Sequence, residues 1–183
     1  MSSDKASFRH IFEEKQESAV INLGGAAEAF LSLEKDTEQG KHIMKLLLKD
    51  RKGFCKLALQ HGVSLVPVIS MEEHMLFDLI QLPAVAHKFQ LYLQKHVLGI
   101  APVVVWGNKW PFMPKRHELN VFVGKPIHCD KIEHPTTEQI GTKHQEYCHA
   151  LDAMFQQCKQ LVKGCEHWEL EFVGHPSLSR KQR

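Results

Sequence analysis

An apolar run that ends in two consecutive glycines constrains the fold of this chain more than any other feature. Residues 20–23, Val-Ile-Asn-Leu, run directly into Gly24 and Gly25, and two alanines and Glu28 follow. A strand that turns into a helix at glycine is typical of α/β proteins, which place ligands at such junctions because backbone N–H groups point outward there. We therefore expect a strand over residues 19–23 and a short helix over residues 26–33, with Glu28 directed at a ligand.

The same turn has a structural interpretation that needs no ligand. A tight strand-to-helix turn would leave Glu28 on the surface in the first helical turn, where the helix dipole favours a carboxylate. The spacing of the glycines also differs from the GxGxxG of dinucleotide-binding folds. The residues alone leave both interpretations open.

Two adjacent cations at the start of a helix form the second informative feature. Arg51, Lys52, Gly53 and Phe54 open a segment over residues 52–60 that we expect to be helical. Cations at a helix N-terminus oppose the macrodipole, so their presence there favours a phosphate-bearing ligand, with glycine allowing its close approach. A solvated helix end is the alternative.

Apolar patterning and turn residues divide the rest of the chain into alternating helices and strands. This alternation indicates an α/β domain with a largely parallel sheet and flanking helices. We expect one domain over residues 1–164 and a tail over residues 165–183. Helices are expected over residues 4–18, 52–60 (ended by Gly62), 71–98 (broken at Pro83) and 136–163 (begun by a Thr136–Gln139 capping box), and strands over residues 63–70, 102–106 and 119–123, with residues 42–48 ambiguous.

Composition excludes several classes of protein. The 183 residues carry 23 Lys and Arg against 21 Asp and Glu, a formal net charge of +2, which is too small to favour a nucleic-acid partner. The five cysteines are odd in number and form no CxxC pair, so we expect reduced thiols facing a cytosol-like compartment. No run of 18 apolar residues occurs, so we expect no transmembrane segment in this chain.

The sequence offers no complete catalytic or metal-binding motif of its own. Neither GxSxG nor HExxH occurs, and His128, followed five positions later by Glu133, only approaches the H-x4-D spacing of many acyltransferases. His144 and Cys148 stand one helical turn apart and could share a metal, but structural zinc needs four ligands and no further pair lies nearby. We therefore expect no metal and an ordinary polar helix face.

An ordered set of short motifs resembles the C-terminal half of the type-two diacylglycerol, monoacylglycerol and wax-alcohol acyltransferases. The resemblance extends over residues 3–163, and the order of the motifs is more specific than any one of them. The motifs are SDKAS at 3–7, GGAAEA at 24–29, RKGFCKLAL at 51–59, HG at 61–62, LVPV at 65–68, GKPI at 124–127 and HPT at 134–136.

The resemblance implies an acyltransferase-like α/β fold and transfer of an acyl group from acyl-CoA to a glyceride or long-chain alcohol. Such enzymes make neutral lipids at the cytosolic face of the endoplasmic reticulum membrane, with acyl-CoA as substrate and no further cofactor. Carried over, Glu28 would line the catalytic cleft, and the substrate-binding residues would be Gly24, Gly25, Arg51, Lys52, Gly53 and Phe54. A membrane surface and full-length relatives are the other partners that the resemblance implies.

The chain also departs from the family pattern. The family's general base is a histidine in an upstream His-Pro-His-Gly motif, which this sequence does not contain, and the hydrophobic anchor hairpin is absent as well. Glu72 stands where the family has glycine, Trp106-Gly107-Asn108 stands for His-Gly-Arg, and Glu118 replaces a proline. We therefore expect an incomplete fold that is inactive alone. The alternatives are a non-catalytic remnant or partner of a full-length relative, and a soluble binder of CoA or another phosphorylated ligand.

Overall fold

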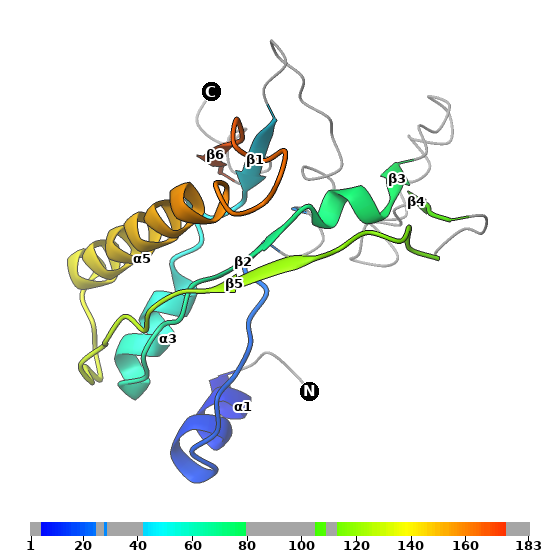
Figure 1. The fold of residues 1–183 in the computed structure, drawn as a ribbon. Helices are drawn as coiled ribbons and strands as arrows, with labels where there is room; N and C mark the ends of the chain where they lie inside the picture. Colours follow the sequence, from blue (N-terminus) through cyan, green and yellow to red (C-terminus); the bar gives the residue numbers. More distant parts are fainter. Residues whose placement is uncertain (1–4, 25–27, 29–41, 80–104, 109–112, 175–183) are drawn as a thin grey trace, which may run out of the picture.

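The computed structural model describes residues 5–24, 28, 42–79, 105–108 and 113–174. This part of the chain contains both helices and short strands (Figure 1). The helix expected over residues 26–33 lies outside the described residues except for Glu28, as do residues 80–98 of the expected long helix. The elements are α1 Lys5–Arg9, π-helix η1 His10–Glu14, β1 Ile43–Leu46, α3 Gly53–His61, β2 Val68–Met71, 3-10 helix η3 Glu73–Leu76, β3 Asp78–Leu79, β4 Val105–Trp106, β5 Asn120–Val123, α5 Thr137–Cys158 and β6 Glu169–Phe172.

The described strands form three separate pairs of mixed direction. β1 pairs in parallel with β6, so that Ile43 faces Glu169, whereas β2 pairs antiparallel with β5 and β3 antiparallel with β4. The α/β class therefore holds in its coarse sense, but the expectation of a largely parallel sheet is wrong for the described residues. The order of the strands along the chain does not indicate the direction in which they pair, because β1 and β2 each pair with a strand that lies far away in the sequence.

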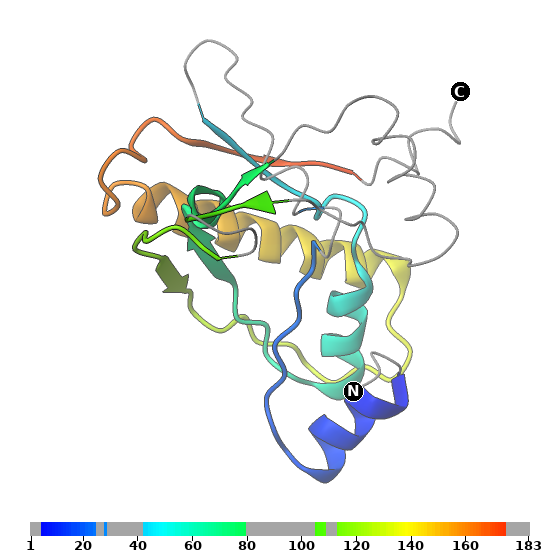
Figure 2. The same ribbon diagram turned by 90° about the vertical axis from the view of Figure 1, so that its right-hand side faces the viewer.

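Helix α5 organises the hydrophobic core. It lies between the β1–β6 pair and α3 in both views (Figures 1 and 2). Its buried face consists of His144, Tyr147, Leu151, Phe155 and Cys158, which recur at helical spacing. Burying a side chain such as Leu151 contributes about 1.5–3 kcal/mol. The core that α5 covers also includes Leu48, Phe54, Cys55, Ile69, Met71, Ile127, Val162, Cys165 and Trp168.

Two helix boundaries follow the local rules that the sequence predicted. Thr136 caps α5: its hydroxyl accepts from the N–H of Gln139, and the Gln139 side chain accepts from the N–H of Thr136. Gly62 ends α3 in the left-handed region, with φ of 65°. The end of α5 was placed too late, because the helix stops at Cys158 and the following residues form turns up to Gly164.

Several expected elements are wrong in the described part of the chain. Residues 19–23 form no strand, and Val20 is fully exposed instead of packed. The helix expected to begin at residue 71 is replaced by the end of β2, a 3-10 turn and β3. β2 itself begins only at Val68, because the preceding Pro67 has no N–H to donate to a strand ladder. The strand expected over residues 119–123 is confirmed as β5.

The segment after α5 takes part in the fold. The sequence predicts a tail over residues 165–183, whereas the structure buries Cys165 and Trp168 and places β6 beside β1. The sequence does not predict β6, because its Glu-Leu-Glu-Phe pattern is half polar. Among the described residues, no helix is both long and apolar enough to cross a bilayer.

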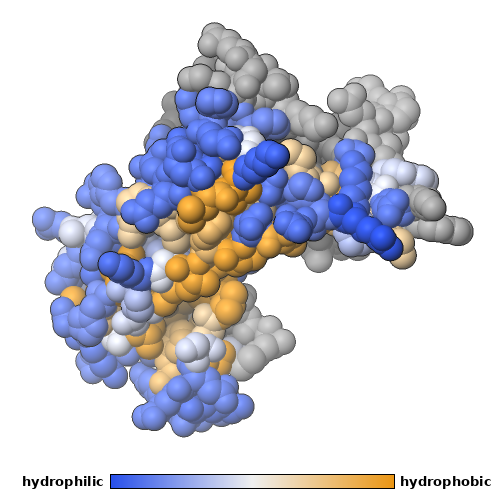
Figure 3. Space-filling view, in the orientation of Figure 1, coloured by the Kyte–Doolittle hydropathy of each residue, from blue (hydrophilic) through white to orange (hydrophobic). Residues whose placement is uncertain are grey.

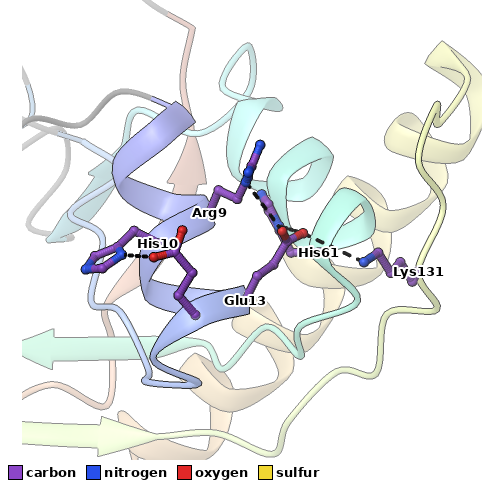
Figure 4. Close-up of polar contacts among 6 residues, drawn as sticks. Arg9, His10, Glu13, His61 and Lys131 are labelled. Atoms are coloured by element: carbon purple, nitrogen blue, oxygen red, sulfur yellow. Dashed lines mark hydrogen bonds and ion pairs between the residues drawn. The ribbon is translucent and has the colours of Figure 1, made fainter.

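The N-terminal helix is held against the C-terminal end of α3. Glu13 accepts from Nδ1 of His61 at 3.1 Å and lies 3.7 Å from Nζ of Lys131 and 3.7 Å from Nε of Arg9 (Figure 4). The ring of Phe12 packs on His61, with the two ring centres 5.6 Å apart. One carboxylate thus joins three segments of the chain.

Candidate functional site

The candidate site is built around the loop between β1 and α3, residues 47–52. Leu47 and Leu48 anchor this loop in the core, with 1% and 2% of their surface exposed. The loop turns because the N–H of Arg51 donates to the carbonyl of Leu48 at 3.1 Å, and the N–H of Lys49 reaches the carbonyl of Val173 at 3.3 Å. The loop therefore presents Arg51 from a fixed backbone.

A buried histidine holds the loop from the opposite side. Nε2 of His144 on α5 lies 2.9 Å from the carbonyl oxygen of Leu48. A carbonyl oxygen can only accept, so Nε2 must carry the proton in this contact. The sulfur of Cys148 lies 3.9 Å from each nitrogen of the His144 ring, and the centre of the Phe54 ring lies 6.1 Å from the centre of the same ring. The sequence predicts an incidental residue on an ordinary polar helix face, whereas the structure buries His144, which acts as a positioning residue of the core.

Glu28 packs against the same loop. Its half-buried carboxylate accepts a hydrogen bond from the backbone N–H of Leu47. Burial raises the pKa of Glu28 above its ordinary value, while the Leu47 N–H and the Arg51 charge act in the opposite direction, and Glu73 raises the pKa further. A carboxylate with a raised pKa is a better proton acceptor than an ordinary one. Glu28 is therefore partly accessible to solvent, has Arg51 as a cationic neighbour and is more basic than an ordinary glutamate.

Gly24 makes room for Glu28. Gly24 is buried, and a Cβ atom at this position would overlap the carboxylate of Glu28. The space at Gly24 is therefore taken up by Glu28 of the same chain, and the role of Gly24 in substrate binding stays a prediction. Gly25 lies outside the described residues.

The two cations have different environments. Arg51 is half-buried and close enough to Glu28 to interact with its charge, whereas Lys52 is exposed at the N-cap of α3 with no side-chain capping bond. Glu28 offsets part of the unfavourable interaction between Arg51 and the helix dipole. Lys52 is left as the accessible cation beside the first N–H groups of α3.

Gly53 and Phe54 differ from each other as well. Gly53 is exposed, and a Cβ there would meet open space, so the described structure gives no steric reason for glycine. Phe54 is buried in the core, with its ring edge-on to Tyr147 at 4.8 Å between ring centres. Its packing role is clear, and its role in substrate binding stays a prediction.

Glu73 is an addition to the site that the sequence did not predict, and Glu72 directly precedes it. Glu73 contributes to the field at Glu28, and the carboxylate of Glu72 lies 3.2 Å from Nε2 of His117 and 3.4 Å from Nδ2 of Asn120. Glu72 adopts φ of 64°, in the left-handed region that favours glycine. The replacement of the family's glycine by Glu72 was the available signal.

The arrangement suits a ligand that carries both an anion and an ionisable proton. Exposed Lys52 and the start of α3 provide positive charge for an anion such as phosphate. Glu28, a half-buried carboxylate that can accept a proton, interacts with the charge of Arg51, which directly precedes Lys52 in the sequence. The group that binds an anion and the group that accepts a proton come from different segments of the chain, which meet at the β1–α3 loop.

Comparison with known proteins identifies the family. The diacylglycerol acyltransferase family model matches residues 1–173. The chain is 36% identical over 155 residues to human 2-acylglycerol O-acyltransferase 3, 37% identical over 150 residues to diacylglycerol O-acyltransferase 2 of Dictyostelium discoideum, and 32% identical over 161 residues to human acyl-CoA wax alcohol acyltransferase 2. No solved structure matches the chain.

The matches cover most of this chain but less than half of the relatives. The three alignments cover 79%, 78% and 84% of the chain, and 42%, 43% and 46% of the respective relatives. The match of the family model over nearly the whole chain agrees with the ordered motifs around Gly24 and Arg51. The chain belongs to the diacylglycerol acyltransferase family.

Proposed function

We propose that this chain takes part in acyl transfer from acyl-CoA to the hydroxyl group of a glyceride or a long-chain alcohol. The names of its relatives support this class of reaction, because they are acyltransferases of acylglycerols and wax alcohols. The observation that carries the proposal is the junction of Glu28, Arg51 and Lys52 at the β1–α3 loop. We place the reaction in lipid synthesis at the cytosolic face of the endoplasmic reticulum.

Each residue of the junction has a role in this proposal. Lys52 and the N-terminus of α3 hold phosphate groups of CoA, and Arg51 links this anion region to Glu28. Glu28 lines the cleft near the acceptor alcohol. In the reaction, the hydroxyl oxygen bonds to the thioester carbon, the carbon–sulfur bond breaks, and the proton of the hydroxyl ends on the CoA thiol.

The chain is proposed to need a further catalytic group. The 183 residues contain no His-Pro-His-Gly, and a general base typically contributes about 10²–10⁴-fold to the rate. We therefore propose binding of acyl-CoA without appreciable turnover by this chain alone. A non-catalytic role as partner of a full-length relative is the alternative, and it is compatible with the same binding site.

Calorimetric titration with CoA tests the anion region directly. We expect wild type to bind, and Arg51→Ala/Lys52→Ala to bind at least tenfold more weakly, because two cations near the phosphate groups are removed. Lys56→Ala is the matched control, since Lys56 is also exposed on α3 but lies one turn farther from its start. Absence of CoA binding by a folded wild-type chain would disprove the proposed role.

An acyl-transfer assay tests the incomplete chemistry. Microsomes that contain this chain are supplied with labelled acyl-CoA and either diacylglycerol, monoacylglycerol or a fatty alcohol. We expect no product above the level of microsomes without the chain. Robust product that disappears with Lys52→Ala would show that the chain is catalytically complete.

A further inference from the structure

The loop that presents Arg51 is a tight turn that is closed by one carbonyl oxygen. The carbonyl of Leu48 accepts the N–H of Arg51 at 3.1 Å, which is the hydrogen bond that closes a β-turn over residues 48–51. Lys52 follows this turn directly and is the N-cap of α3. The orientation of Arg51 and of the first N–H groups of α3 therefore depends on how firmly the turn is held.

The turn is held at its buried end. Its two central residues, Lys49 and Asp50, are exposed, whereas Leu47 and Leu48 are buried in the core. The oxygen that closes the turn belongs to Leu48 and therefore lies at the buried end. Any further hydrogen bond to this oxygen restrains the direction in which the whole turn leaves the core.

A second donor reaches the same oxygen from the middle of α5. Nε2 of His144, a buried side chain, lies 2.9 Å from the carbonyl oxygen of Leu48. Helix α5 packs against α3 and β2, and hydrophobic side chains gather along β2 and β5 in Figure 3. His144 thus ties the turn to an element that is itself anchored in the core, as supporting residues behind a binding site do.

A neighbouring thiol keeps the proton of His144 on the correct nitrogen. The sulfur of Cys148 lies 3.9 Å from both ring nitrogens, and only Nδ1 is free to accept, because Nε2 donates to Leu48. Burial raises the pKa of Cys148 above its ordinary value, so the thiol keeps its proton and can donate it weakly. A nitrogen that accepts carries no proton, which leaves the proton of the neutral ring on Nε2.

We propose that His144 is a positioning residue for anion binding, whose Nε2–H holds the turn so that Arg51 and the start of α3 are directed at the phosphate groups of CoA. The inference rests on the proposed binding of CoA and deepens it by naming the residue behind the site. His144 itself touches no ligand. Without its donor, binding must also order the turn, and this lowers the affinity.

Three substitutions of His144 separate the hydrogen bond from packing. In His144→Gln the amide nitrogen is the same number of bonds from Cα as Nε2 and can donate in its place, whereas in His144→Asn it is one bond nearer to Cα. His144→Leu fills similar space without a donor. In calorimetric titration with CoA, we expect the glutamine variant to bind within about twofold of wild type, and the other two about fivefold more weakly, as for the loss of one net hydrogen bond.

Two controls separate positioning from a general loss of stability. His149→Leu makes the same chemical change at an exposed position of α5. Leu151→Val removes one carbon from the same buried face of α5, about two turns beyond His144, and lowers stability through packing alone. We expect both variants to bind CoA like wild type. Binding by Leu151→Val that is as weak as that of His144→Leu would show that affinity follows stability, and would overturn the proposal.

Hydrogen exchange of the chain without CoA tests the turn directly. By mass spectrometry, amides of residues 47–53 should exchange at least severalfold faster in His144→Leu than in wild type and in His144→Gln, while the start of α5 should exchange at the same rate in all three. Circular dichroism must show that each variant is folded, and the glutamine and asparagine pair decides if the leucine variant is not. Unchanged exchange over residues 47–53 in a folded variant without the donor would overturn the proposal.

The titrations separate failure of this inference from failure of the proposed function. If the folded wild-type chain does not bind CoA, the proposed binding is wrong and the inference fails with it. If wild type binds CoA and the leucine and asparagine variants bind equally well, only the inference fails, and the CoA site does not depend on His144.

Discussion

Nε2 of His144 donates to the backbone carbonyl of Leu48 at 2.9 Å and joins the middle of α5 to the loop that presents Arg51. The same carbonyl accepts the N–H of Arg51 at 3.1 Å. One buried oxygen therefore connects the core helix, the β1–α3 loop and the cation of the candidate site. Because both donors converge on it, a change at His144 should affect the loop before it affects the rest of the core.

Replacing His144 by alanine tests this connection. The substitution removes a hydrogen bond to a buried carbonyl and leaves space beside Phe54, so we expect the free energy of unfolding to fall by about 1–3 kcal/mol. Urea denaturation measures the change. His149→Ala is the control, because His149 is exposed on the same helix and should cost much less. Equal effects of the two substitutions would contradict the role of His144.

Two substitutions at Glu72 separate backbone strain from side-chain contacts. Both Glu72→Gly and Glu72→Ala remove the carboxylate that contacts His117 and Asn120. Only glycine adopts φ of 64° without steric cost, so the glycine variant should be more stable than the alanine variant by roughly 1 kcal/mol. Thermal melting of the pair gives the difference. An alanine variant as stable as the glycine variant would show that Glu72 is not strained.

The boundaries that the sequence predicted correctly are those set by local hydrogen bonds. Thr136 and Gln139 satisfy each other within four residues, and Gly62 needs only its own φ, so both signals were readable without a tertiary fold. The direction of strand pairing depends on contacts between distant segments. Ile43 meets Glu169 across the whole middle of the chain, and no local pattern contains that information.

The candidate site shows the same division. The residue types at Gly24, Glu28 and Arg51 were identified from their spacing, and the structure brings Glu28 and Arg51 together. The groups that set their environment were not identifiable, because the Leu47 N–H is a backbone donor and His144 arrives from a helix almost a hundred residues later. Electrostatic environment is a property of the packed molecule and not of the sequence.

The raised pKa of Glu28 predicts a pH dependence of stability. The folded state favours the protonated form, so the contribution of Glu28 is fully present below its ordinary pKa of 4.5 and is lost as pH rises through the raised folded pKa. Glu28→Gln stays neutral at every pH. We therefore expect the stability of this variant relative to wild type to increase from pH 4.5 upward and then level off, as measured by urea denaturation across pH. A difference that falls with pH would contradict the raised pKa.

Thiol reactivity should follow burial along the core. Burial raises the pKa of Cys55 well above its ordinary value, to about 12, and that of Cys165 to about 11. A higher pKa lowers the fraction of thiolate at pH 8, and the thiolate is the reactive form. With iodoacetamide and mass spectrometry, we expect half-buried Cys148 to be alkylated first and Cys55 last, at the rate of unfolding. Urea should make all five cysteines react alike, and fast labelling of Cys55 in the folded chain would show that the contact between α3 and α5 opens readily.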